Sequence, residues 1–192
     1  MKLFSLMIIM IIMVSCVITV PYKANLKTVD INGISSMIVD NKMLDLMYTN
    51  SYEDSIAKFN FIFNNEAIFL SIINKFNKPI SIKWDECAYV NQDGKNLRCI
   101  HQGIKYTNKS IAQLPTYVSP HGRHNDMLIP ESYIYYSTTY NEWKTIPIYV
   151  QRAYGKKMAD SIREKYIGKK ISIMLSIDIG TSIVYMFNFL FE

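Results

Sequence analysis

The sequence predicts a mainly β protein, an antiparallel sandwich of the immunoglobulin-like type with one helix in its C-terminal half. The sheets are predicted by hydrophobic residues that recur at every second position in several short runs. Turn residues separate about seven such runs at intervals of about 8 to 12 residues. At 192 residues the chain is long enough for one hydrophobic core. We therefore expect a single β-sandwich domain over residues 37–192.

The end of the chain gives the clearest strand pattern. Isoleucine and leucine alternate with more polar residues from Ile171 to Ile179, and large hydrophobic residues alternate from Ile183 to Phe191. Gly180-Thr181-Ser182 lies between them and supplies turn residues. This pattern predicts a β-hairpin.

Earlier runs fit the same architecture. Residues 44–48, 59–63 and 80–84 alternate, whereas residues 67–73 are apolar on both faces, as in a central strand. Four prolines fall between residues 103 and 149. Proline cannot donate to a sheet ladder, so we expect this stretch to form long loops with short edge strands.

One segment has the spacing of a helix. Tyr154, Met158, Ile162 and Tyr166 recur every four residues, and Gly168 follows as a C-terminal cap. Because the C-terminal strands need a cover, we expect this stripe to pack on the sheet rather than on a membrane surface.

The first residues have the features of a secretory leader. Lys2 precedes an apolar stretch from Leu3 to Val14, and the small residue Ser15 precedes Cys16. Met13-Val14-Ser15-Cys16 resembles the lipobox of bacterial lipoproteins. The resemblance implies cleavage after residue 15, lipid on Cys16, and a tether over residues 16–36.

Two or three acyl chains would hold such a protein stably, since each buried methylene contributes about 0.8 kcal/mol. The resemblance implies a bacterial cell envelope location, with the outer membrane favoured because Val17, and not aspartate, follows the cysteine. Two alternatives remain. The chain is simply secreted, or the apolar run 3–20 is a transmembrane anchor.

The net charge of +5 is mild, and no run reaches five or six like charges. We therefore expect no nucleic-acid partner. Nor does any phosphate-binding or dinucleotide-binding glycine motif predict a cofactor.

Cys87 and Cys99 are the two remaining cysteines. If residues 92–94 form a three-residue loop with Gly94 in the left-handed conformation, paired residue numbers sum to 186 and the cysteines face each other. Three alternatives stay open: a disulfide, two buried free thiols, or a reactive or metal-binding role.

The three histidines are the candidates for a metal site. His101, His121 and His124 could join Cys99, but their spacing matches no established zinc pattern. No nucleophile motif is present either. We expect no metal, no catalytic residue and no enzyme activity. The alternative is a metal-binding or hydrolytic enzyme that uses the region from Cys99 to Asp126.

An aromatic cluster lies in the irregular region. Its members are Tyr133, Tyr135, Tyr136, Tyr140 and Trp143. Such amphipathic rings suit a binding surface for sugars, peptides or a partner protein. The alternative, which we favour from sequence, is that they close one edge of the core.

A further series contains Ile82-Lys83-Trp84-Asp85-Glu86, Tyr89-Val90, Gly94, Arg98, Ile100-His101, Gly103, Gln113, Pro115 and Pro120. It resembles a pattern that recurs in bacterial envelope lipoproteins, and it implies no particular activity. The sequence thus predicts a lipid-anchored binding or assembly module whose partner is a membrane and another envelope protein or a glycan.

Overall fold

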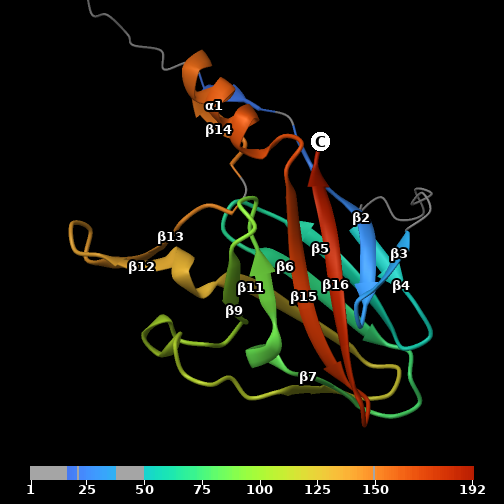
Figure 1. The fold of residues 1–192 in the computed structure, drawn as a ribbon. Helices are drawn as coiled ribbons and strands as arrows, with labels where there is room; N and C mark the ends of the chain where they lie inside the picture. Colours follow the sequence, from blue (N-terminus) through green and yellow to red (C-terminus); the bar gives the residue numbers. More distant parts are fainter. Residues whose placement is uncertain (1–16, 21, 38–49, 149) are drawn as a thin grey trace, which may run out of the picture.

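The computed structural model describes residues 17–20, 22–37, 50–148 and 150–192 (Figure 1). The leader, Cys16 and the strand expected at residues 44–48 lie outside these residues. The tether expected over residues 16–36 is largely folded where it is described, because β1 (Val17–Thr19) and β2 (Ala24–Ile31) lie within it and β3 (Ile34–Met37) begins in it.

Twelve of the described strands form one antiparallel sheet, in the order β3-β2-β16-β15-β8-β9-β11-β6-β5-β4, with β7 pairing both β15 and β10. They are β2 (Ala24–Ile31), β3 (Ile34–Met37), β4 (Asn50–Glu53), β5 (Ala57–Phe63), β6 (Ile68–Asn74), β7 (Ile80–Ile82), β8 (Ala88–Val90), β9 (Asn96–Ile100), β10 (Thr116–Val118), β11 (Arg123–Pro130), β15 (Lys170–Asp178) and β16 (Ser182–Phe191). Short 3₁₀ helices cover Trp84–Glu86, Tyr106–Asn108 and Glu131–Tyr133.

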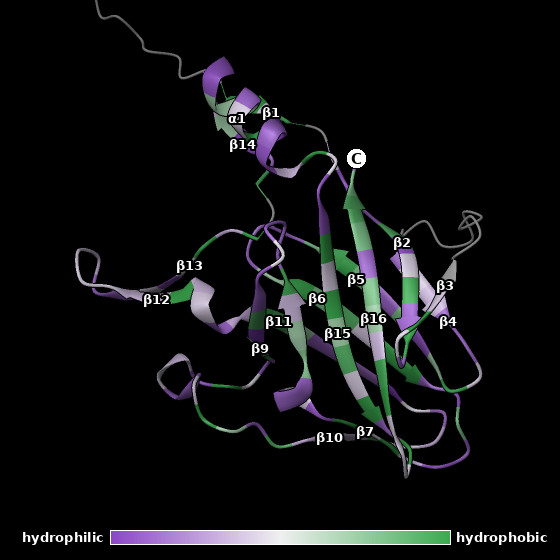
Figure 2. Cartoon of the chain, viewed as in Figure 1, coloured by the Kyte–Doolittle hydropathy of each residue, from purple (hydrophilic) through white to green (hydrophobic). Residues whose placement is uncertain are grey.

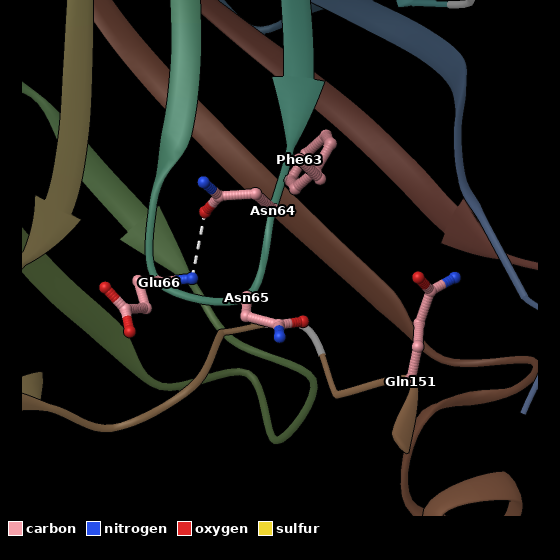
Figure 3. Close-up of a pocket in the computed structure, with 5 residues that line it drawn as sticks. All are labelled: Phe63, Asn64, Asn65, Glu66 and Gln151. Carbon is pink, nitrogen blue, oxygen red and sulfur yellow. Dashed lines mark hydrogen bonds between the residues drawn. The ribbon is translucent and has the colours of Figure 1, made fainter. Parts of the chain in front are cut away.

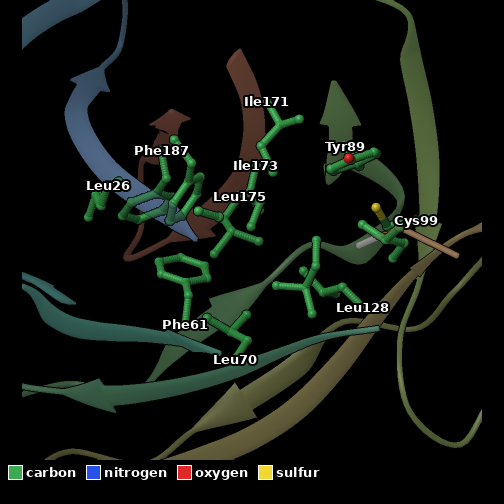
Figure 4. Close-up of a cluster of buried hydrophobic side chains, with 14 of the residues drawn as sticks. Leu26, Phe61, Leu70, Tyr89, Cys99, Leu128, Ile171, Ile173, Leu175 and Phe187 are labelled. Carbon is green, nitrogen blue, oxygen red and sulfur yellow. The ribbon is translucent and has the colours of Figure 1, made fainter. Parts of the chain in front are cut away.

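This sheet curls so that its two halves face each other across the core. Phe61 on β5 lies 4.8 Å from Phe187 and 5.3 Å from Phe189 on β16, measured between ring centroids. Figure 4 shows Phe61 and Leu70 from one half opposite Phe187 and Leu175 from the other. The mainly antiparallel, sandwich-like fold predicted from the sequence is therefore confirmed, with both layers supplied by one continuous sheet.

Asn50 joins the two ends of the curled sheet. Its side chain accepts a hydrogen bond from the Leu26 amide and donates one to the Ala24 carbonyl, both at 2.7 Å. The β3 strand covers only the far half of β2, from Thr28 to Ile31. Asn50 therefore satisfies backbone groups of β2 that none of the described strands pairs.

The C-terminal hairpin has the predicted arrangement. Residues Ile171 and Phe189 are paired, as are Ile177 and Ile183. The inward-facing residues of both strands are buried, except Ile183 beside the turn, which is partly buried. β15 and β16 each turn one face to the core and the other towards solvent, which explains why their alternation is the strongest in the sequence.

The proline-containing stretch differs from the prediction. β11 is eight residues long and lies between β9 and β6, so it is an internal strand and not a short edge strand. Its first half hides the strand pattern because the charged Asp126 occupies a buried position. Pro130 ends the strand opposite Cys99.

The helix α1 (Lys156–Tyr166) lies at one end of the molecule with a small ribbon of β1 (Val17–Thr19) and β14 (Arg152–Tyr154) (Figure 1). Ala159, Ile162 and Tyr166 are buried, and the Tyr166 ring lies 5.7 Å from that of Phe191. The prediction that this stripe packs on the sheet is correct for Ile162 and Tyr166 only. Tyr154 belongs to β14, and both Tyr154 and Met158 are exposed.

Candidate functional site

Four of the five residues of the aromatic cluster lie on a hairpin that projects from the body of the molecule (Figure 1). Its strands are β12 (Ile134–Ser137) and β13 (Glu142–Thr145), which pair only with each other among the described strands. We call residues 134–145 the aromatic hairpin. Tyr136 lies directly opposite Trp143 in its register, so both side chains stand on one face.

Most of the aromatic side chains face solvent. The exposed fractions are 46% for Tyr135, 44% for Tyr136, 67% for Tyr140 and 38% for Trp143. The interpretation that the cluster closes an edge of the core is therefore wrong for these four residues. It holds for Tyr133 alone, which packs against the core 6.4 Å from the Tyr89 ring.

Three of the exposed rings, those of Tyr136, Tyr140 and Trp143, are held in place by neighbouring side chains. Trp143 is edge-on to Tyr136 at 5.5 Å and to Tyr106 at 5.9 Å. The Tyr136 hydroxyl donates to the side chain of Asn141, a turn residue with φ of 55°. On the other face, Lys144 Nζ lies 3.6 Å from the centre of the Tyr140 ring. Such contacts reduce the entropy lost when the rings bind a partner.

Arg98 fixes the base of the hairpin to the sheet. Its guanidinium contacts the carboxylates of Asp85 at 2.6 Å and Glu131 at 2.9 Å, and it donates to the carbonyls of Lys109 and Ile111. The hydrogen bond from Arg98 holds the pKa of Asp85 below its usual value. Since Glu131 begins the short 3₁₀ helix that leads into the hairpin, this network sets the direction in which the hairpin leaves the body.

Sequence reasoning missed three supports of this surface: Tyr106, Asn141 and Arg98. Tyr106 comes from a separate segment, so no local pattern connects it to Trp143. Asn141 in a Tyr-Asn-Glu turn between two aromatic runs was the one local signal of a hairpin here.

A second polar cluster surrounds Asp126 on β11. Its carboxylate is 3% exposed and accepts from His124 Nε2 at 2.8 Å and from His101 Nδ1 at 3.2 Å. Trp84 stacks on His101 at 4.5 Å. The ring nitrogens that contact Asp126 are directed at one shared carboxylate oxygen. This is the geometry of a closed hydrogen-bond network.

The other candidate metal ligands do not join this cluster. Cys99 faces the core, and His121 lies exposed in the turn before β11. Within the described residues, no three His, Cys, Asp or Glu side chains are arranged to hold a metal ion.

Cys87 and Cys99 are free thiols and both are buried (Cys99 in Figure 4). The predicted register around them is confirmed. Ala88 pairs with Arg98, and Gly94 has φ of 75°. Burial raises the pKa of Cys87 to about 12 and also raises that of Cys99. Neither thiol is therefore activated as a nucleophile.

A pocket of about 360 Å³ lies beside the β5–β6 turn (Figure 3). It is lined by Phe63, Asn64, Asn65, Glu66 and Gln151. Asn64 Oδ1 accepts from the amides of Glu66 and Ala67, and Gln151 donates to the carbonyl of Tyr22. The side-chain amides of Asn64 and Gln151 are thus already bonded to the local backbone. The pocket is therefore a weaker candidate for ligand binding than the aromatic hairpin.

Among the described residues, no helix is both long and apolar enough to span a bilayer. Comparison of the chain with protein-family models, with curated proteins and with solved structures found no match.

Proposed function

We propose that this chain is a lipid-anchored binding module of a bacterial cell envelope, which contacts a partner protein through the aromatic hairpin. The observation that supports this proposal is the exposure of four aromatic side chains on one projecting, internally braced ribbon. Tyrosine and tryptophan supply much of the binding energy at protein interfaces, and they bury large areas with few rotatable bonds.

The hairpin favours a protein partner over a glycan for two reasons. Its rings meet edge to face, so Trp143 and Tyr136 offer no continuous flat platform for a sugar ring. In addition, neither outer edge of the ribbon pairs with another described strand. Unpaired strand edges can accept an extended segment of another protein.

The binding role can be tested by site-specific photo-crosslinking in cells that make the full chain. A photoreactive phenylalanine analogue replaces Tyr140 in the hairpin, and in the control it replaces Tyr117, which is equally exposed but lies on β10. We expect one discrete protein adduct from position 140 and none from position 117.

Trp143→Ala is then added to the chain that carries the analogue at position 140. It should lower the affinity for the partner about 30-fold, with a corresponding loss of the adduct. Truncation of such an aromatic anchor costs about 2 kcal/mol or more. Equal adducts from both positions would contradict the proposal. An adduct with glycan alone would assign the surface to sugar recognition.

The anchor is tested separately. Cells are labelled with radioactive palmitate, and the wild-type chain is compared with Cys16→Ala. The lipoprotein proposal expects label on the wild type alone, whereas a transmembrane anchor needs no cysteine.

A further inference from the structure

The positive charge of this protein is concentrated at the end that contains α1. Residues 152–170 hold seven of the 21 Lys and Arg residues and two of the 16 Asp and Glu residues. Their net charge of +5 equals that of the whole sequence, so the rest of the chain is neutral. We propose that this end, formed by β1, β14 and α1, is a membrane-contacting surface that binds anionic phospholipid headgroups.

All seven basic side chains are exposed. They are Arg152, Lys156, Lys157, Arg163, Lys165, Lys169 and Lys170. Only Arg163 forms an ion pair within the described chain, with Asp160 at 3.1 Å. The charge is therefore available to an external anion instead of being neutralised internally.

Lys156 and Lys157 lie at the end of α1 where positive charge is electrostatically unfavourable. They occupy its first turn, which contains no acidic residue. The N-terminus of a helix carries partial positive charge, so lysines there cost stability and acidic residues would be favoured. The two lysines and the helix end together create a strongly positive local potential, which an anionic surface would relieve.

Exposed apolar side chains lie beside these lysines. Val17 is paired with Tyr154, which places both on the outer face of the ribbon, while Ala153 faces the helix and is fully buried. Val17, Tyr154 and Met158 are 48%, 68% and 40% exposed. Tyrosine and the long lysine stems suit the interface between headgroups and acyl chains.

The surface also lies where a lipid on Cys16 would bring it, since Val17 is the next residue in the chain. This part of the argument rests on the proposed function. In Figure 2, α1 and β14 form the end of the molecule opposite β7. A membrane explains the combination of charge, apolar side chains and position better than nucleic acid, which would require only the charge.

The test uses the mature chain with Cys16→Ser, made without its leader, because all described elements begin at residue 17 or later. Circular dichroism establishes that this protein is folded. Its binding is measured by co-sedimentation with vesicles of phosphatidylcholine, alone or mixed with phosphatidylglycerol, in low and high salt. We expect binding only to the anionic vesicles, and less in high salt.

The double substitution Lys156→Gln/Lys157→Gln should lower the partition coefficient about 30-fold, because each basic residue near an anionic surface contributes about 1 kcal/mol. Its melting temperature should stay the same or rise, which excludes unfolding as the cause. The control Lys78→Gln/Lys105→Gln removes the same charge elsewhere on the surface and should bind normally.

Equal binding to neutral vesicles, or undiminished binding by the Lys156/Lys157 variant, would overturn the inference. So would tight binding to random-sequence duplex DNA with none to vesicles. The outcomes also separate this inference from the lipid anchor. If the full chain takes up palmitate but the unlipidated Cys16→Ser protein does not bind anionic vesicles, the proposed lipid anchor stands and the proposed membrane-contacting surface is wrong.

Discussion

At the scale of single residues, Cys87 and Cys99 show how a pattern can give the correct register and leave the chemistry open. The pairing rule placed the cysteines opposite each other, and the strands follow that register. Whether opposed thiols join depends on side-chain orientation, which alternation does not determine. In the structure they are separate and buried.

This state predicts the result of a thiol titration. The folded mature chain, isolated without reductant, should react negligibly with a thiol reagent at neutral pH, because burial raises both pKa values and blocks access. In denaturant both thiols should react. A chain that shows no thiols in denaturant until reductant is added would contain the disulfide instead.

Asp126 is a buried carboxylate that accepts hydrogen bonds from four donors. Burial raises its pKa, but hydrogen bonds from His101, His124 and the amides of Gln102 and Met127 outweigh that effect, so the pKa is lower than usual. A carboxylate with a lowered pKa in the folded state contributes stability above its unfolded pKa, near 3.9. That contribution is lost as the pH falls through the folded value.

We therefore expect Asp126→Asn to reduce the free energy of unfolding at neutral pH by about 1 to 3 kcal/mol, because one charged acceptor for four donors is replaced. The loss should shrink as the pH falls from about 4 through the lowered pKa of the folded carboxylate, because the wild-type side chain then becomes protonated too. Urea unfolding at several pH values measures both effects. A difference that is constant across this range would show that the charge is not responsible.

At the scale of elements, local patterns predicted hairpins well. The β15–β16 hairpin and the β8–β9 turn could be read from alternation and turn residues because the partners are close in sequence. β11 and the aromatic hairpin could not. Buried Asp126 breaks the alternation of β11, and support from Tyr106 and Arg98 for the aromatic surface comes from distant segments.

Substitution of Gly94 tests whether the β8–β9 turn needs a residue in the left-handed conformation. Gly94 has φ of 75°, and a Cβ at this position would meet nothing within 4 Å, so only the backbone conformation disfavours other residues. Gly94→Ala should cost about 1 kcal/mol of stability. Gly94→Asn should cost less, since asparagine tolerates the left-handed region. Equal thermal stability of wild type and both variants would show that the turn relaxes.

At the scale of the whole molecule, the sequence predicted layers but not the way they connect. Phe59 and Phe61 on β5 contact Phe187 on β16, more than a hundred residues later. Alternation shows which residues face inward, but it does not show which inward face meets which. The curl of the sheet, and the role of Asn50 where its ends meet, follow only from that long-range packing.

Asn50 therefore tests the closure of the sheet. Asn50→Ala should reduce the free energy of unfolding by about 2 to 4 kcal/mol, because it leaves two buried backbone groups of β2 without partners. The matched control is Asn25→Ala on β2, which removes an exposed hydrogen bond to Glu192 and should cost little. Hydrogen exchange at the Leu26 amide should accelerate in Asn50→Ala alone. If both variants unfold at the same denaturant concentration, the two ends of the sheet do not depend on this side chain to stay together.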